Sequence, residues 1–405
     1  MGLNRTLARL SLTGAMLLIL AFVAGVRYLQ EPFPTTSGPG EGGVPASGTF
    51  VLALDQRDHT RSAVFWWSGW GEDPVLLLHA GANPQIAVDP AAGRLYLADT
   101  RGAGLAVEDY LAVYQVLPPA EEGKAPALKP LHEVTVTDRV RYKEPGLTPY
   151  LVLRSGGGPV FLTGGSGPSN TDYTAWVNGY DPKSLQVAYQ GGRFPGLQAP
   201  RPLVPRQDGE IKVALWSGNQ FLALGRGGGV VRDWTVAGAG GMLPPTVRAA
   251  VLAPDGKRVY GFLARKLTWF AWDKSFSRDQ EIVLPEGWQV VRGTACLSVD
   301  GKQVMVGVSP KEQAAQGRVR EVWMFDAATG DAVRKVALER PVDGFAPARD
   351  GDYLLTWDRA LEGLVRIDVA TAAPDSGAAP GDTPRRAGKT WSARMAGWAP
   401  VWMAP

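Results

Sequence analysis

Apolar residues alternate with polar ones along short segments of this chain, and turns that contain Asp or Gly separate the segments. Alternation with a period of two over such short segments predicts half-buried β-strands. One phrase recurs, in which an apolar strand, an Asp-Gly type of turn and a second apolar strand follow one another. It occurs at residues 253–262, 298–308 and 347–357, and in variant form at 87–99. The pattern therefore predicts an all-β chain built from hairpins.

A second phrase, a strand that ends in an Asp-led turn before another strand, occurs at residues 175–191, 322–338 and 363–374. Together the two phrases form units of about 40 to 50 residues that contain only strands, which is typical of a β-propeller. In each unit we expect four strands, named a to d from the propeller axis outward. The predicted propeller domain covers residues 49–405.

The spacing of these units predicts a seven-bladed β-propeller. Six blades are expected within single stretches of chain, at residues 86–138, 150–191, 202–237, 248–285, 293–339 and from 344 onward. The strands predicted at the start of the domain, at 50–54, 63–67 and 74–79, lack a fourth. We expect residues 397–403 (GWAPVWM) to supply it, because they echo the phrase GFAP at 344–347. Pairing of the N- and C-terminal strands would close the ring and remove its free edges; six or eight blades are also compatible with the repeat length.

The connections between the predicted strands differ in length. Those from a to b and from c to d are expected to be tight turns, whereas those from b to c and from d to a are long and varied. Because function usually resides on long loops over a rigid scaffold, the face with the b–c and d–a loops is the candidate binding face.

The N-terminus has the pattern of a targeting segment. Residues 12–26 are almost entirely apolar and follow Arg5 and Arg9, and no acidic residue precedes Glu31. We expect a signal anchor or transmembrane helix at 1–30 and a Pro/Gly-rich linker at 31–48. An uncleaved anchor would place the propeller on the extracytoplasmic side of the cell membrane as a single-pass protein. Cleavage of the segment would instead give a secreted protein.

Composition excludes several functional classes. The net charge is +3, and no run of Lys or Arg indicates nucleic-acid binding. Cys296 is the single cysteine and is expected to be a buried, inert thiol, so that no disulfide within the chain and no cysteine metal cluster can form. The three histidines have no spacing typical of metal ligands. We expect no cofactor, no metal, no assigned catalytic residue and a monomeric chain.

Arginines are frequent in the loops of the candidate face. Their planar guanidinium groups suit carboxylates and phosphates, which favours an anionic ligand or an acidic partner surface. The alternative is local pairing of these arginines with nearby acids on a solvated rim. The polar cluster that contains Asp58 and His59 is a further candidate on this face, and the alternative for it is a solvated b–c turn. The predicted ligand-binding residues are Arg101, Arg139, Arg141, Arg193, Arg201, Arg265, Arg292, Arg318, Arg340, Arg359, Asp58 and His59.

The turn Asp-Ala-Ala-Thr-Gly at residues 326–330, within this repeat phrasing, resembles the superfamily of YVTN-type and quinoprotein amine dehydrogenase-like β-propellers. The resemblance covers roughly residues 49–405 and implies a propeller fold. We expect a membrane-tethered binding or scaffold module for a cell-envelope protein partner or an anionic small molecule. The alternative is a propeller enzyme, either a lactonase-like hydrolase or a quinoprotein-like dehydrogenase subunit. A lactonase would need acids and a histidine at the channel mouth, where Asp58 and His59 are the nearest candidates.

Overall fold

The computed structural model of the chain describes residues 48–58, 60–69, 72–102, 108–119, 121, 124–136, 150–154, 157–166, 173–206, 209–235, 246–271, 278–348, 353–369, 385–386 and 390–404. Within these, only the backbone is described for residues 166, 267–271, 278–281, 385–386, 390–391 and 401–404. The chain divides into two compact units, Met1–Thr36 and Ser37–Pro405. The described residues all belong to the second unit, and the rest of this section concerns that unit alone.

The described strands form seven sheets, numbered here along the chain. Sheet 1 contains β29 (Trp398–Ala404), β1 (Thr49–Asp55), β2 (Ser62–Trp67) and β3 (Val75–Ala80). Sheet 2 contains β4 (Gln85–Asp89), β5 (Arg94–Arg101), β6 (Glu108–Leu117) and β7 (Ala127–Val136). Sheet 3 contains β8 (Leu151–Leu153), β9 (Val160–Ser166), β10 (Thr174–Tyr180) and β11 (Val187–Pro195). Sheet 4 contains β12 (Arg201–Leu203), β13 (Val213–Ser217), β14 (Gln220–Leu224) and β15 (Val230–Thr235).

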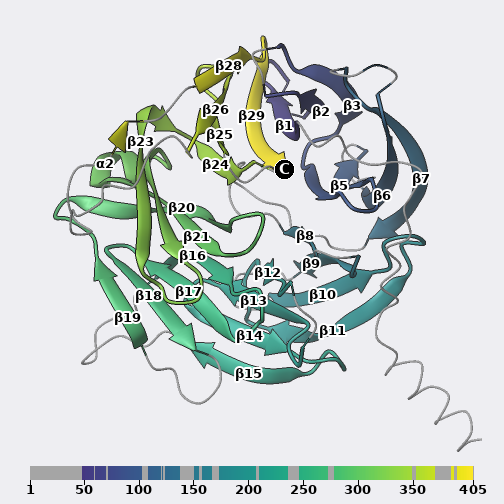
Figure 1. Cartoon of the computed structure of the whole chain (residues 1–405). Helices are drawn as coiled ribbons and strands as arrows, with labels where there is room; N and C mark the ends of the chain where they lie inside the picture. Colours follow the sequence, from purple (N-terminus) through teal and green to yellow (C-terminus); the bar gives the residue numbers. More distant parts are fainter. Residues whose placement is uncertain are drawn as a thin grey trace, which may run out of the picture. The chain divides into compact units, whose positions relative to one another are not determined.

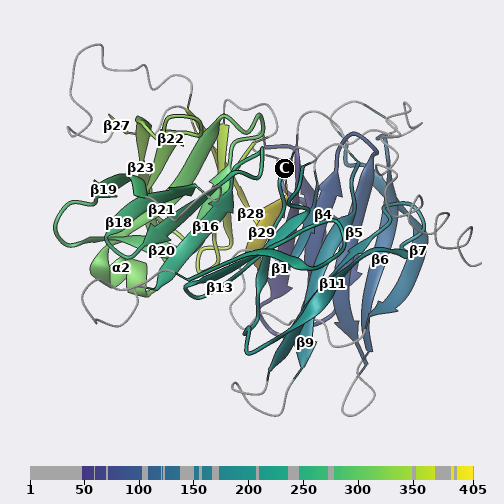
Figure 2. The same cartoon turned by 90° about the horizontal axis from the view of Figure 1, so that it is seen from below.

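Sheets 5 to 7 complete the domain. Sheet 5 contains β16 (Val247–Leu252), β17 (Arg258–Leu263), β18 (Lys266–Ala271) and β19 (Arg278–Val283). Sheet 6 contains β20 (Trp288–Leu297), β21 (Gln303–Pro310), β22 (Val319–Asp326), β23 (Ala332–Val342) and β27 (Arg385–Arg386). Sheet 7 contains β24 (Gly344–Pro347), β25 (Tyr353–Asp358), β26 (Gly363–Asp368) and β28 (Thr390–Arg394). The short helix α2 (Lys311–Ala315) connects β21 to β22. Figure 1 shows the sheets around a common centre, and Figure 2 shows α2 beside β20 and β29 beside β1.

Apolar packing between neighbouring sheets holds the ring together. In the described part of the chain each of seven apolar clusters joins two successive sheets. Phe262 of sheet 5 and Trp323 of sheet 6 share one cluster, for example. Trp67 of sheet 1 and Trp357 of sheet 7 share the cluster that completes the circle. Because every sheet has a neighbour on both faces, its middle strands are apolar runs such as TFVLALD in β1 and SAVFWW in β2.

The two ends of the chain meet in sheet 1. Strand β29 pairs with β1 in antiparallel orientation, from Phe50 opposite Ala404 to Asp55 opposite Trp398, with a bulge after Leu52. The Trp398 ring contacts Phe65 of β2 edge-on, with 5.3 Å between the ring centroids. The pairing expected for residues 397–403 is therefore present.

The fold-class prediction, a seven-bladed propeller preceded by a transmembrane helix, needs correction. Six sheets take their four main strands from one part of the chain, whereas sheet 1 is a composite of both chain ends. The domain therefore has six single-segment blades and one closing sheet, and sheet 6 carries the additional strand β27, parallel to β23. Over the described ranges no helix is long and apolar enough to cross a membrane. The predicted anchor at 1–30 lies outside those ranges, as does all of the linker except Gly48.

The expected division between short and long connections is also wrong in part. In sheets 4 and 5 the b–c turns contain two residues each, Gly218–Asn219 and Ala264–Arg265. In sheet 4 the a–b connection, between β12 and β13, is longer than the b–c turn. Arg206 in this connection donates to the carbonyl oxygens of Ser298, at 2.7 Å, and of Val299. This contact places the connection on the face of the a–b turns, because Ser298 and Val299 belong to the a–b turn of sheet 6. Long connections therefore lie on both faces of the ring.

Polar contacts between successive blades explain part of the repeated phrase. The Tyr96 hydroxyl on β5 donates to the Pro182 carbonyl oxygen in the next blade at 3.0 Å, and Arg94 Nη1 donates to the same oxygen at 2.8 Å. Tyr260 and Arg258 on β17 donate in the same way to the carbonyl oxygens of Ala327 and Ala328. The Arg-apolar-Tyr triplet at the start of a b strand thus fixes the c–d turn of the following blade.

Candidate functional site

The inner strands of the seven sheets surround the centre of the ring and carry few charged side chains (Figure 1). Three successive inner strands carry one arginine each: Arg201 on β12, Arg248 on β16 and Arg292 on β20. Asp89, the acid on an inner strand, lies at the end of β4 and accepts backbone hydrogen bonds within its own turn. Among the described residues, the positive charges on inner strands therefore lie in sheets 4 to 6.

Arg201 is held between aromatic rings. Its guanidinium carbon lies 5.4 Å from the ring centroid of Trp216, the residue opposite it on β13, and 5.7 Å from that of Tyr150 in sheet 3. Attraction between a cation and the ring faces fixes the guanidinium plane without neutralising its charge.

Arg248 and Arg292 lie on neighbouring inner strands. Arg248 is half-buried, and its Nη1 donates to the Val290 carbonyl oxygen of β20 at 3.0 Å. Burial, and after it the charge of Arg292, lowers the pKa of Arg248. Neither arginine has an ion pair within the described part of the chain. Arg292 is exposed. Like charges on neighbouring strands repel each other, and a bound anion would relieve that repulsion.

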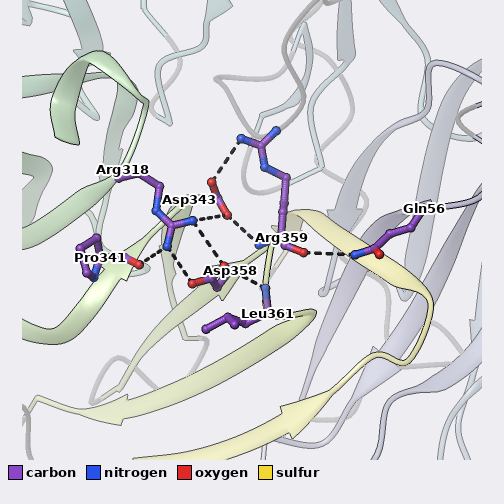
Figure 3. A network of polar contacts seen from close by, with 7 residues as sticks. All are labelled: Gln56, Arg318, Pro341, Asp343, Asp358, Arg359 and Leu361. Atoms are coloured by element: carbon purple, nitrogen blue, oxygen red, sulfur yellow. Dashed lines mark hydrogen bonds and ion pairs between the residues drawn. The ribbon is translucent and has the colours of Figure 1, made fainter. Parts of the chain in front are cut away.

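A second polar group lies where sheets 6, 7 and 1 meet (Figure 3). Arg318, after α2, contacts two buried carboxylates: its Nη2 lies 2.8 Å from Asp358 Oδ2, and its Nη1 lies 3.2 Å from Asp343 Oδ2. Asp343 also accepts from the backbone N–H of Arg359 at 2.6 Å and from its Nη2 at 3.2 Å. Burial alone would lower the pKa of Arg318, but the hydrogen bonds that it donates to Asp358 and the charges of both acids outweigh burial and raise that pKa.

This second group joins loops of successive sheets. The carbonyl oxygen of Arg359 accepts from Gln56 Nε2 at 3.3 Å, and the backbone N–H of Gln56 donates to Gly397 just before β29. Two arginines and two aspartates give it no net charge. The arrangement therefore stabilises the closure of the ring, and it matches the local pairing that was the alternative for Arg318 and Arg359.

The remaining predicted site residues are dispersed. Arg101 pairs with Glu108 and Glu133 on an exposed surface, at 2.9 and 2.6 Å, which also indicates local pairing. Asp58 accepts from the backbone and hydroxyl of Thr60 in a turn. The structure places Arg193, Arg265 and Arg340 at exposed positions of sheets 3, 5 and 6. Arg139, Arg141 and His59 lie outside the described residues.

Sequence reasoning missed Arg248. It lies in the segment VRAAVL, which looks like an ordinary buried strand, and the signal that could have marked it is a charged residue at the start of an a strand. Cys296 was expected to be a buried, inert thiol, and the residue is partly exposed. Burial of the sulfur nevertheless raises the pKa of its thiol to about 12, which makes it a poor nucleophile. In the described ranges no three His, Cys, Asp or Glu residues are arranged to hold a metal ion.

No family model and no curated protein sequence matches the chain. Solved structures do match it in fold. The periplasmic gluconolactonase PpgL of Pseudomonas aeruginosa superposes with a TM-score of 0.57 at 16% identity, over 88% of this chain and 99% of that one. Two proteins described as putative 6-phosphogluconolactonases also match: that of Bacteroides uniformis with a TM-score of 0.51, at 16% identity over 80% and 92% of the two chains, and that of Bacteroides fragilis with 0.50, at 14% over 84% and 92%. The chain is thus a β-propeller, and its resemblance to the propeller superfamily is confirmed at the level of fold.

Proposed function

We propose that the protein is a lactonase-like hydrolase that acts on a sugar-derived lactone at the centre of the propeller. The observation that carries the proposal is the pair Arg248 and Arg292 on neighbouring inner strands, with no ion pair within the described residues. The fold likeness to proteins described as lactonases supports the choice of reaction. Ligand sites also occur commonly at the centre or mouth of barrel-like folds.

The chemistry of lactone opening suits such a pair of cations. The oxygen of a water molecule adds to the carbonyl carbon, and negative charge develops on the carbonyl oxygen. The bond between that carbon and the ring oxygen then breaks, the ring oxygen takes a proton, and the product is a hydroxy acid that ionises to a carboxylate. Guanidinium groups already in position would stabilise both the oxyanion and the product carboxylate, and the partial burial of Arg248 would strengthen its share of that interaction.

The test is hydrolysis by the full chain of D-glucono-1,5-lactone and of its 6-phosphate, followed as acid release at constant pH. We expect rates above spontaneous hydrolysis for at least one of them. Arg248→Gln and Arg292→Gln should each reduce the enzymatic rate by about 100-fold, the effect typical of losing one oxyanion donor. Arg193→Gln is the matched control, since Arg193 is exposed on the outer strand β11. Rates equal to the spontaneous ones with both lactones would reject the proposal.

A binding or scaffold module is the second candidate. Exposed valines on the neighbouring outer strands β11 and β15 favour it, because exposed apolar side chains on sheet edges suit a protein partner. These valines are Val187, Val230 and Val231.

In this proposal residues 1–30 anchor the chain in the membrane with the propeller on the extracytoplasmic side. Resistance of the full chain to carbonate extraction from membranes, and its release when residues 1–30 are deleted, would support the anchor. Saturable binding of gluconate without turnover of either lactone would favour this candidate over the hydrolase.

A further inference from the structure

A cavity of about 230 Å³ lies between sheets 6 and 7, away from the inner strands. One wall is formed by β23 and the other by β25, β26 and β28. The lining residues are Leu338, Glu339, Arg340, Val342, Thr356, Val365, Ile367 and Ser392.

The cavity lies beside an irregularity of β23. Val342 pairs with Val319 and Ala337 pairs with Glu321, so four residues of β23, 338–341, lie opposite the single residue Arg320 of β22. Extra residues in one strand bend it away from regular pairing, which leaves space between two blades. Arginines of sheet 6 satisfy the freed carbonyl groups: Arg320 Nη1 donates to Glu339 at 3.0 Å, and Arg318 Nη2 donates to Pro341. The space is therefore a built feature of this blade interface.

The walls of the cavity combine apolar side chains with polar groups, and its rim is charged. Leu338, Val342 and Ile367 are buried, whereas Arg340 and Glu339 are exposed. Neither Arg340 nor Glu339 has an ion pair within the described part of the chain.

Gly363 leaves room for the Arg340 guanidinium. A Cβ atom at Gly363 would lie 3.1 Å from Arg340 Nη2, tighter than an ordinary contact. Across sheet 7, Thr356, Val365 and Ser392 are register partners and so lie in one row on the cavity wall. The row adds two hydroxyl groups to the apolar wall.

We propose that this cavity binds a small molecule with a branched apolar body and a carboxylate group. The apolar body would lie against Leu338, Val342 and Ile367, and Arg340 would bind the carboxylate. The volume lies below the range of about 300 to 1,000 Å³ common for drug-sized ligands, so the ligand has about ten non-hydrogen atoms or fewer. An apolar amino acid and the corresponding simple carboxylic acid share this chemistry, and Glu339 would favour the amino acid by accepting from its ammonium group. The site is separate from the inner-strand arginines and does not depend on the proposed hydrolase activity.

The test is isothermal titration calorimetry of the full chain with leucine, with 4-methylpentanoate and with 3-methylbutylamine. Leucine or 4-methylpentanoate should bind saturably, and the amine should not bind. Arg340→Gln should weaken carboxylate binding by about tenfold or more. Ser392→Leu, which fills the cavity from an exposed position, should abolish it. Unchanged melting temperatures would show that both variants are folded, and Arg193→Gln is the control for loss of one arginine charge.

The Glu339→Gln variant distinguishes the amino acid from the carboxylic acid as ligand. If Glu339→Gln weakens leucine and leaves 4-methylpentanoate unchanged, the site selects the amino acid; if it changes neither, the site takes the carboxylic acid. Absence of saturable binding by both carboxylates would overturn the proposal. Binding that survives both Arg340→Gln and Ser392→Leu would overturn it as well, because the ligand would then occupy another site.

Discussion

Replacing Arg318 with Met tests the polar group that joins sheets 6 and 7 (Figure 3). Asp358 is 2% exposed and accepts two hydrogen bonds from Arg318, at 2.8 and 3.4 Å. Without Arg318, the hydrogen bond from the backbone N–H of Leu361 to Asp358, at 3.2 Å, remains. Asp343 loses less, because Arg359 still donates to it twice. Removing one member of a buried ion pair leaves the other charge uncompensated, which costs about 3 to 5 kcal/mol. For a domain of this length that corresponds to a fall in Tm of about 4 to 7 °C.

Differential scanning calorimetry of the full chain at pH 7 measures the effect. The double variant Arg318→Met, Asp358→Asn removes the stranded charge together with its partner, and we expect it to recover at least half of the lost Tm. Arg193→Met, at an exposed position on β11, is the control and should change stability by less than about 0.5 kcal/mol. Arg318 does not compensate a buried charge if Arg318→Met lowers the Tm no more than Arg193→Met does, or if the double variant is no more stable than the single one.

Three further predictions concern stability and reactivity. Deletion of residues 397–405 removes β29 from sheet 1 and should abolish the cooperative calorimetric transition of the whole domain; a normal transition would contradict ring closure. Burial raises the pKa of several tyrosines, among them Tyr96 and Tyr189, so their stabilisation is complete below the unfolded pKa of about 10 and is lost as pH rises through the raised folded values. The Tm should therefore fall steeply above pH 10, and Tyr189→Phe should make that fall shallower; an equally steep fall in the variant would contradict the assignment to Tyr189. Cys296, with a thiol pKa of about 12, should react with Ellman's reagent at pH 8 far more slowly in the folded protein than in urea, and equal rates would show an open thiol.

The strands and the pairing of the chain ends could be predicted because both follow from local patterns. Alternation identifies a strand, and the echo between residues 397–403 and 344–347 marks a fourth strand for the first sheet. The triplets at 94–96 and 258–260 were visible within the repeated phrase as well. Their carbonyl partners in the next blade were not, because contacts between blades depend on packing and not on local sequence.

The candidate site was harder to predict for the same reason. Whether an arginine can bind a ligand depends on its partners, and those of Arg318 lie 25 and 40 residues away in sequence, at Asp343 and Asp358. Arg248 has no ion pair within the described residues but lies in a segment that reads as plain strand. The cavity beside β23 had one sequence signal, Pro341, since proline within a strand often marks a bulge. Neither its volume nor its charged rim could be inferred from that residue.

In the proposed hydrolase, Arg248 and Arg292 bind the reacting lactone at the centre of the propeller. The most direct measurement is the initial rate of hydrolysis of D-glucono-1,5-lactone and its 6-phosphate by the full chain, compared with the double variant Arg248→Gln, Arg292→Gln at equal melting temperature. We predict hydrolysis by the wild type and by Arg193→Gln, and only the spontaneous rate with the double variant. Equal rates in the wild type and the double variant would contradict the claim.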